Sequence, residues 1–157
     1  MDIIGSQDRE CSCSSSQISK YMNRISGPLL DRIDIHIEVS PVKYEKLQGT
    51  ETSESSSDIK KRVDAARKLQ RNRYKEYGIL SNSELTPRLI NKFCKLGENE
   101  KILLQDAFKK LGLSARAYGR ILKLARTIAD LEACEEIKTH HLAEAIQYRS
   151  LDRKFWS

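Results

Sequence analysis

The chain has 157 residues, of which 39% are hydrophobic and 32% are charged, and its formal net charge is +6. The length suits one ordinary domain, or a small domain with part of another, and the apolar content is too high for a disordered chain. The positive charge suits an anionic partner such as nucleic acid or nucleotide phosphate. No stretch approaches the roughly 18 apolar residues that span a membrane, and no secretion signal is visible, so the sequence predicts a soluble, cytoplasmic protein without membrane contact.

The first 40 residues predict a helix, a corner and a strand. Serines up to Ser16 can cap a helix that begins near Gln17, and Gly27 with Pro28 ends it. From Ile33 to Val39 apolar and polar residues alternate, which is typical of a strand with one buried face. Because a lone strand is unstable, either the chain dimerises through it or the other strands of its sheet are missing.

Residues 48–58 contain only small, polar or acidic residues, so they predict a linker. After the linker, apolar residues recur at helical spacing over residues 58–150, which predicts a compact bundle of about five helices. The expected helix boundaries are a stop at Gly78, a start at Thr86 and Pro87, stops at Gly97 and Gly112, and caps at Ser114 and Thr139.

The familiar catalytic motifs are absent from the sequence, which contains no GxxxxGK[ST], GxGxxG, HExxH or GxSxG. An independent nucleotide site is therefore not expected. Cys11 and Cys13 supply half of a zinc ligand set, and two thiolates do not fill a tetrahedral shell. Adjacent His140 and His141 would point about 100° apart on a helix. We predict no metal site.

Cations concentrate between Ile59 and Tyr77, a stretch that contains eight Lys and Arg residues and only two acidic residues. On a helix, four of them share one side and could follow a phosphate backbone, and the alternative is an ordinary solvated face. These candidate nucleic-acid contacts are Lys60, Arg67, Arg71 and Lys75.

Arg116 follows the predicted cap Ser114 and would lie in the first turn of a helix. A cation there opposes the helix dipole, so this end of the helix invites an anion. The alternative is a surface arginine whose stem packs on the core. Arg120 and Lys123 continue on the same side.

Three stretches together resemble one family: RISGPLLDRIDIHIEV, LGLSARAYGRILKLARTIADLE and HLAEAIQYRSLDR. They are similar to the C-terminal part of the magnesium-chelatase-like AAA+ ATPases of the ComM/YifB type. The resemblance implies a mainly α fold, in which a helical lid bundle follows the last helix and strand of an α/β AAA+ core. The implied parts are a core remnant over residues 1–47, a linker over 48–58 and the lid over 59–157.

The resemblance also implies two site residues. Arg32 matches the arginine finger, which reaches the nucleotide of the neighbouring subunit, and Arg116 matches the second-sensor arginine, which contacts the terminal phosphate of ATP. The full-length family members bind ATP and Mg²⁺ through Walker motifs that this chain lacks. The chain by itself is therefore expected to bind no cofactor and to be no enzyme.

The implied partners are the missing AAA+ core, the neighbouring subunits of a hexameric ring, and DNA. The implied work is helicase or branch-migration activity in competence and recombination. Two other functions remain open, which are a separate basic helical module that binds nucleic acid and a part of a motor for metal chelation.

Overall fold

The structure is a computed structural model that describes residues 13–37, residue 39 and residues 54–149. It divides into two compact units, Met1–Ile33 with Ile37–Ser53, and Asp34–His36 with Glu54–Ser157. Cys11 and most of the predicted linker lie outside the described residues, and the domain boundaries at 47 and 58 stay predictions.

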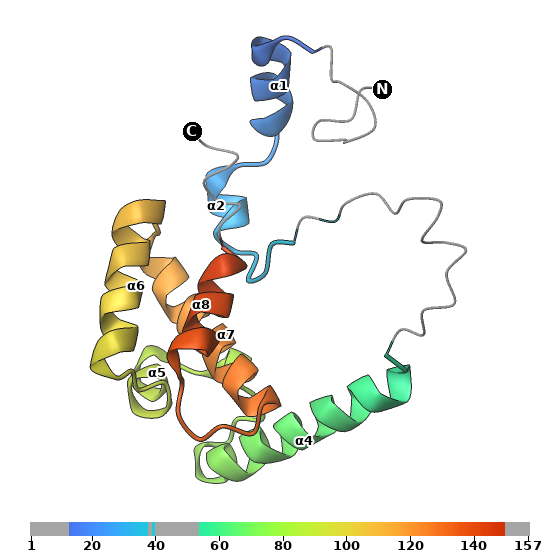
Figure 1. Cartoon of the computed structure of the whole chain (residues 1–157), viewed down its shortest axis with the longest axis vertical. Helices are drawn as coiled ribbons and strands as arrows, with labels where there is room; N and C mark the ends of the chain where they lie inside the picture. The colour runs from blue at the N-terminus through green and yellow to red at the C-terminus, as the bar shows by residue number, and fades with distance from the viewer. Residues whose placement is uncertain (1–12, 38, 40–53, 150–157) are drawn as a thin grey trace. The chain divides into compact units, whose positions relative to one another are not determined.

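The described part of the first unit contains two short helices (Figure 1). Helix α1 spans Ser15–Met22 and begins at a capping box, because the Gln17 N–H donates to Ser14 Oγ at 3.4 Å and the Ser14 N–H donates to Gln17 Oε1 at 2.9 Å. Helix α2 spans Gly27–Leu30 and begins at the predicted corner. The serine cap is thus confirmed, and the helix starts two residues before the expected Gln17.

The predicted strand at Ile33–Val39 is wrong for its described residues, 33–37 and 39, none of which is in a strand. The four apolar side chains of the alternating pattern are all exposed. A strand needs backbone partners on a neighbouring strand, and the described residues supply none. Instead, the backbone N–H of His36 donates to the carbonyl oxygen of Tyr148 at 3.0 Å.

The second unit is a bundle built from helices and short 3₁₀ turns, which confirms the mainly α fold (Figure 1). No helix within the described ranges is long and apolar enough to cross a membrane. The elements are α4 (Ser56–Tyr74), η1 (Lys75–Tyr77), η2 (Asn82–Glu84), α5 (Pro87–Phe93), α6 (Glu98–Leu111), α7 (Ala115–Leu131) and α8 (Thr139–Gln147).

Helix α7 forms the centre of this bundle. It contacts α4, η2, α5 and α8, and α6 packs against α8. Ile121, Leu122, Ala125 and Ala129 on α7 are buried almost completely. Because burial of a large aliphatic side chain contributes about 1.5–3 kcal/mol, this stripe is the main reason that the helices assemble.

Most of the predicted helix boundaries are observed, and two are wrong. Gly78 and Gly112 adopt the left-handed conformation that ends a helix, with φ of 65° and 60°. Gly97 instead precedes α6 as its N-cap, because α5 already ends at Phe93. Thr139 is the first residue of α8 and not its cap.

Candidate functional site

A cleft of about 480 Å³ lies beside α7 and is lined by its cations Arg116, Arg120 and Lys123. The three residues are spaced by four and three positions, so they share one side of the helix. Helix α7 begins where Ser114 Oγ accepts a hydrogen bond from the backbone N–H of Ala117 at 3.2 Å. The predicted cap therefore places Arg116 in the first turn of α7, and its side chain lines this cleft.

The three cations differ in their contacts. Arg120 forms an ion pair with Asp34, and Lys123 Nζ donates to the carbonyl oxygen of Ser83 at 2.7 Å. Arg116 is exposed, and its guanidinium has no hydrogen-bond or ion-pair partner among the described residues. Arg116 is therefore the cation of the cleft that can accept an external anion without losing a contact of its own.

Arg32 lies in the first unit, two residues after the end of α2. It is exposed, and its Nη1 donates to the carbonyl oxygen of Pro28 at 3.4 Å. The backbone N–H of Arg32 donates to Leu29 at 3.0 Å and that of Ile33 to Leu30 at 3.0 Å. The turn thus presents the side chain to solvent directly after a tight corner.

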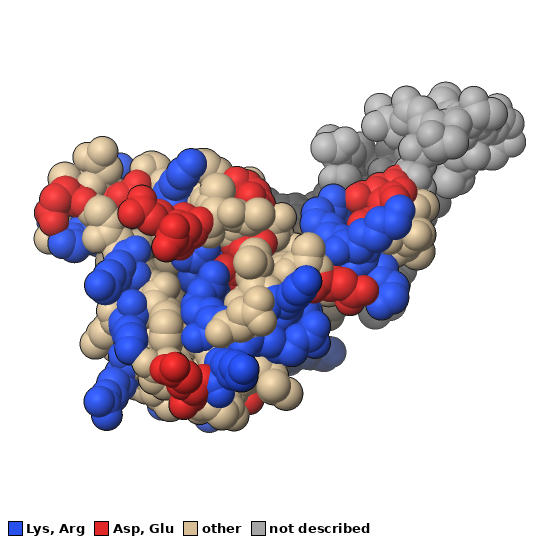
Figure 2. All heavy atoms as spheres, turned by 90° about the horizontal axis from the view of Figure 1, so that it is seen from below, with Lys and Arg blue, Asp and Glu red and all other residues tan. Residues whose placement is uncertain are grey.

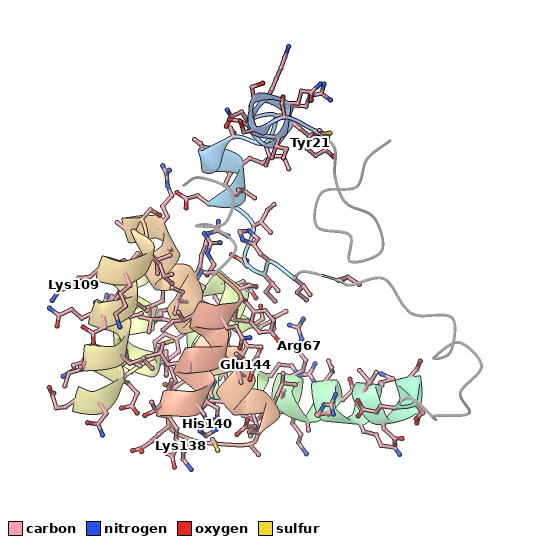
Figure 3. All side chains as sticks on the ribbon, turned by 45° about the horizontal axis from the view of Figure 1, so that its top comes forward. Tyr21, Arg67, Lys109, Lys138, His140 and Glu144 are labelled. Carbon is pink, nitrogen blue, oxygen red and sulfur yellow. The ribbon has the colours of Figure 1, made fainter. Side chains whose placement is uncertain are left out.

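Three residues of the predicted row of cations lie on α4, and Lys75 is the first residue of η1. The N-terminal half of α4 is exposed. Lys60 pairs with Asp64 at 2.9 Å. Arg67, Arg71 and Lys75 have no carboxylate partner in the described part of the chain. The face seen from below in Figure 2 carries many Lys and Arg side chains with acidic residues between them, and Figure 3 shows Arg67 projecting from α4.

A buried polar network that the sequence analysis did not identify fixes α7 against its neighbours. The side chain of Asp130 is fully buried and accepts hydrogen bonds from Arg73 at 2.9 and 2.5 Å, Asn82 at 2.9 Å and Arg126 at 3.1 Å. Tyr74 donates to Asn82 at 2.5 Å. In the sequence, these polar residues stand at helix positions that face the core. Buried polar groups are normally hydrogen-bonded, so the pattern indicates partners but does not identify them.

Burial and pairing shift the ionisation of this network. Burial lowers the pKa of Arg73, but its bonds to Asp130 outweigh that effect and leave the pKa above its ordinary value. Burial raises the pKa of Tyr74 and raises that of the nearby Cys94 to about 11. Arg73 therefore stays charged and Cys94 stays a thiol at neutral pH, so the network supports the fold and offers no nucleophile.

Glu132, His140 and His141 form the cluster closest to a metal-ligand set among the described residues, with their ligand atoms within 4.8 Å of one another. Both histidines place Nε2 at 2.9 Å from Glu132 Oε2. The backbone N–H of Lys138 donates to His141 Nδ1 at 3.0 Å, so His141 carries its proton on Nε2. A metal at Nε2 would break that arrangement, because ligating histidines donate from their other nitrogen. The cluster caps α8, and we assign no metal to it.

The family described as magnesium chelatase, subunit ChlI C-terminal, matches residues 53–149, and that described as magnesium chelatase, subunit ChlI, matches residues 2–47. YifB of Salmonella typhimurium is 43% identical over 142 residues, which are 90% of this chain and 27% of that protein. Competence protein ComM of Haemophilus influenzae is 43% identical over 141 residues, 89% of this chain and 27% of that protein. YifB of Escherichia coli is 41% identical over 142 residues, with the same shares of 90% and 27%.

The chain therefore spans about a quarter of the length of these relatives, and the two family matches follow one another along it with a short gap. The match to the C-terminal family, over residues 53–149, covers the whole described bundle from α4 to α8. A match of this extent, together with identities above 40%, assigns the family. The chain belongs to the magnesium-chelatase-like family that includes the ComM and YifB proteins.

Proposed function

We propose that this chain forms the lid and the arginine-finger turn of a magnesium-chelatase-like AAA+ ATPase, which hydrolyses ATP with Mg²⁺ as an oligomeric ring. Arg116 is the second-sensor residue that contacts the terminal phosphate. Arg32 is the finger that reaches the nucleotide of the neighbouring subunit. The observation that carries the proposal is the guanidinium of Arg116, which lies in the first turn of α7 beside a cleft of about 480 Å³ and has no partner among the described residues.

The chemistry of arginine suits both positions. A guanidinium is a planar, permanently charged group whose fork of N–H donors matches two phosphate oxygens. At the start of α7 the helix dipole adds to the attraction for an anion. An arginine that completes a phosphoryl-transfer site contributes about 10³ to 10⁵ in rate, because it neutralises charge that develops in the transition state.

The test uses a full-length version of the protein, since the chain contains no phosphate-binding loop. Arg116→Ala and Arg32→Ala are each expected to reduce ATP turnover by about 10³ or more. Arg88→Ala is the matched control, because Arg88 is also exposed and in the first turn of a helix, α5, but lies outside the cleft. Turnover in both variants equal to that of Arg88→Ala would refute the assignment.

We further propose that the motor acts on DNA, as a helicase or in branch migration. The support is the name of one relative, a competence protein, and the row of cations on α4 and η1, in which Arg67, Arg71 and Lys75 have no carboxylate partner among the described residues. ATP turnover of the full-length protein should rise with DNA. A motor for metal chelation is the alternative that the family description favours, and it predicts stimulation by a porphyrin instead of DNA.

The same row also supports a second candidate, in which the bundle binds nucleic acid without any ring. Duplex and single-stranded DNA would be titrated into the chain at two salt concentrations. Each phosphate contact contributes about 0.7 to 0.9 to the slope of log affinity against log salt. A slope near zero, or equal affinity for the Arg71→Ala variant, would exclude this candidate.

A further inference from the structure

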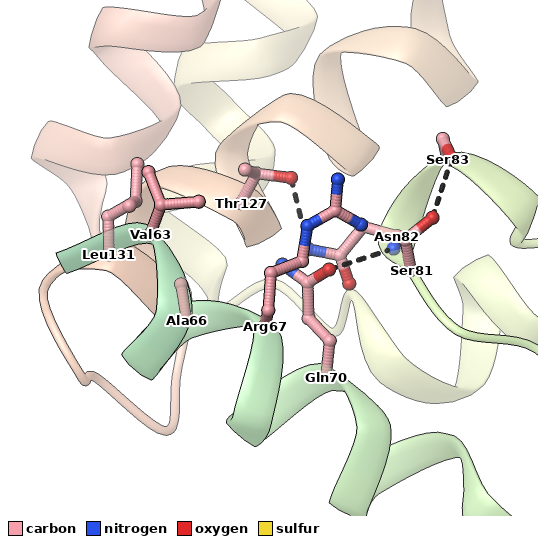
Figure 4. Close-up of a pocket in the computed structure, with 9 residues that line it drawn as sticks. All are labelled: Val63, Ala66, Arg67, Gln70, Ser81, Asn82, Ser83, Thr127 and Leu131. Atoms are coloured by element: carbon pink, nitrogen blue, oxygen red, sulfur yellow. Dashed lines mark hydrogen bonds between the residues drawn. The ribbon is translucent and has the colours of Figure 1, made fainter. Parts of the chain in front are cut away.

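A second, smaller pocket lies between α4, η2 and α7 (Figure 4), and it shares only Ser83 and Thr127 with the Arg116 cleft. Its volume is about 300 Å³. Val63 and Ala66 on α4 and Leu131 on α7 form an apolar wall, and Arg67 and Gln70 contribute polar groups from α4. An aliphatic surface and a cation thus share one concave site.

The pocket contains hydrogen-bond donors that have no acceptor within the described residues. Gln70 is only 4% exposed, and its Oε1 accepts from the backbone N–H of Asn82 at 3.4 Å, so the amide is oriented with its NH₂ group left over. That NH₂ group has no hydrogen-bond acceptor there, and neither has the guanidinium of Arg67. Residues three apart on a helix are neighbours, so the two donor groups can meet the same anion.

Arg67 differs from the cations that precede it on α4, because each of those forms an ion pair. Lys60 pairs with Asp64 at 2.9 Å, Lys61 with Asp58 at 2.9 Å and Arg62 with Glu54 at 2.7 Å. Arg67 is the next cation along the helix, and it lacks such a carboxylate in the described structure. Arg67 thus lines the pocket without a carboxylate partner among the described residues, so a carboxylate of a ligand can take that place.

The apolar surface beside Arg67 is also incomplete. Ile59, Val63, Ala66 and Gln70 are spaced by four, three and four residues, so they continue one face of α4. Ala66 and Gln70 are buried against the bundle, whereas Ile59 and Val63 are each 42% exposed. Leu131 adds a further exposed aliphatic side chain across the pocket.

We propose that this pocket binds an acidic segment of a partner protein, with an aliphatic side chain against Val63, Ala66 and Leu131 and its carboxylate on Arg67 and Gln70. A carboxylate oxygen accepts from both donor groups, and the neighbouring aliphatic side chain covers the apolar wall. A DNA phosphate satisfies the donors but leaves the wall exposed to water, so nucleic acid fits the site less well. The proposal does not depend on the ATPase function, but the pocket shares Arg67 with the row of cations that we propose to contact DNA.

The test uses N-acetyl-leucine, which presents one carboxylate and one isobutyl group, titrated into the ¹⁵N-labelled chain. Cross-peaks of the Gln70 side-chain amide and the Arg67 Nε–H should shift, with a dissociation constant of about 1 mM for a ligand of this size. N-acetyl-leucinamide, which lacks the charge, should bind at least about tenfold more weakly. Equal binding of the two compounds, or no shift of the Gln70 amide, would overturn the proposal.

Two variants and one competitor sharpen the result. Arg67→Ala should weaken binding of N-acetyl-leucine at least about tenfold, whereas Lys68→Ala, which removes an exposed cation of the same helix outside the pocket, should change it less than about twofold. Both variants are expected to keep the unfolding midpoint of the parent chain. Duplex DNA that shifts the Gln70 amide while N-acetyl-leucine does not would assign the pocket to nucleic acid and refute the proposal.

Discussion

The segment at residues 33–39 and helix α7 contain similar aliphatic residues, yet their exposures are opposite. Ile35 and Ile37 are exposed, whereas Ile121 and Leu122 are buried almost completely. Helix α7 packs against α4, α5 and α8, whereas the segment has no second strand to pair with among the described residues. Apolar periodicity therefore shows which face a segment can bury, and a neighbouring surface decides whether that face is buried.

The largest effect on stability is expected from a change in the polar network that fixes α7. Asp130→Ala should lower the free energy of unfolding of the bundle by about 3–5 kcal/mol, because Arg73 and Arg126 would lose their buried carboxylate. Asp64→Ala is the control and removes only the exposed pair with Lys60, with an effect below about 1 kcal/mol. Urea unfolding followed by circular dichroism measures both, and similar midpoints would contradict the role of the network.

Truncation of one aliphatic residue in each region compares the two directly. Leu122→Ala should destabilise the bundle by about 2–5 kcal/mol, because a buried leucine leaves a cavity. Ile35→Ala should cost less than about 0.5 kcal/mol, because its side chain is 44% exposed. A comparable loss from Ile35→Ala would mean that the segment contributes to the core after all.

Helix caps extend the comparison to the ends of elements, because Ser14 and Ser114 make the same kind of bond in different units. Ser114→Ala should lower the stability of the bundle by about 1 kcal/mol, since α7 is its central helix. Ser14→Ala should leave the unfolding midpoint unchanged and only speed amide hydrogen exchange in α1. Thermal unfolding and hydrogen exchange would be measured on both variants, and an equal fall of the midpoint would contradict this distinction.

Features that depend on nearby residues could be predicted from the sequence. The caps at Ser14 and Ser114 and the left-handed Gly78 and Gly112 are examples, since each follows from residues within one turn. The helical bundle followed from apolar spacing in the same way.

Features that depend on contacts between distant residues could not be predicted. Asp130 and Arg73 are 57 residues apart, so nothing local indicates their pairing. The prediction of a strand at Ile33–Val39 was wrong for the same reason. The alternating pattern suits a strand in a sheet, but the described residues contain no neighbouring strand that could pair with it. For Arg116 the sequence allows both an anion site and a surface arginine whose stem packs on the core. Only the fold shows that its guanidinium has no partner among the described residues.

The smallest effect on stability is expected at the start of α8, where the contribution of the Glu132 carboxylate depends on pH. Hydrogen bonds from His140 and His141 hold the pKa of the Glu132 carboxyl below its ordinary value. Because the folded pKa lies below the unfolded one, the ionised carboxylate contributes stability that is full above about pH 4.5 and is lost as the pH falls through the lowered value. In Glu132→Gln this part of the acid dependence should disappear, as thermal unfolding midpoints between pH 3 and 6 would show. Glu136→Gln, which removes an exposed carboxylate without a partner in the described chain, should keep it, and identical pH profiles for the two variants would exclude Glu132 as the titrating group.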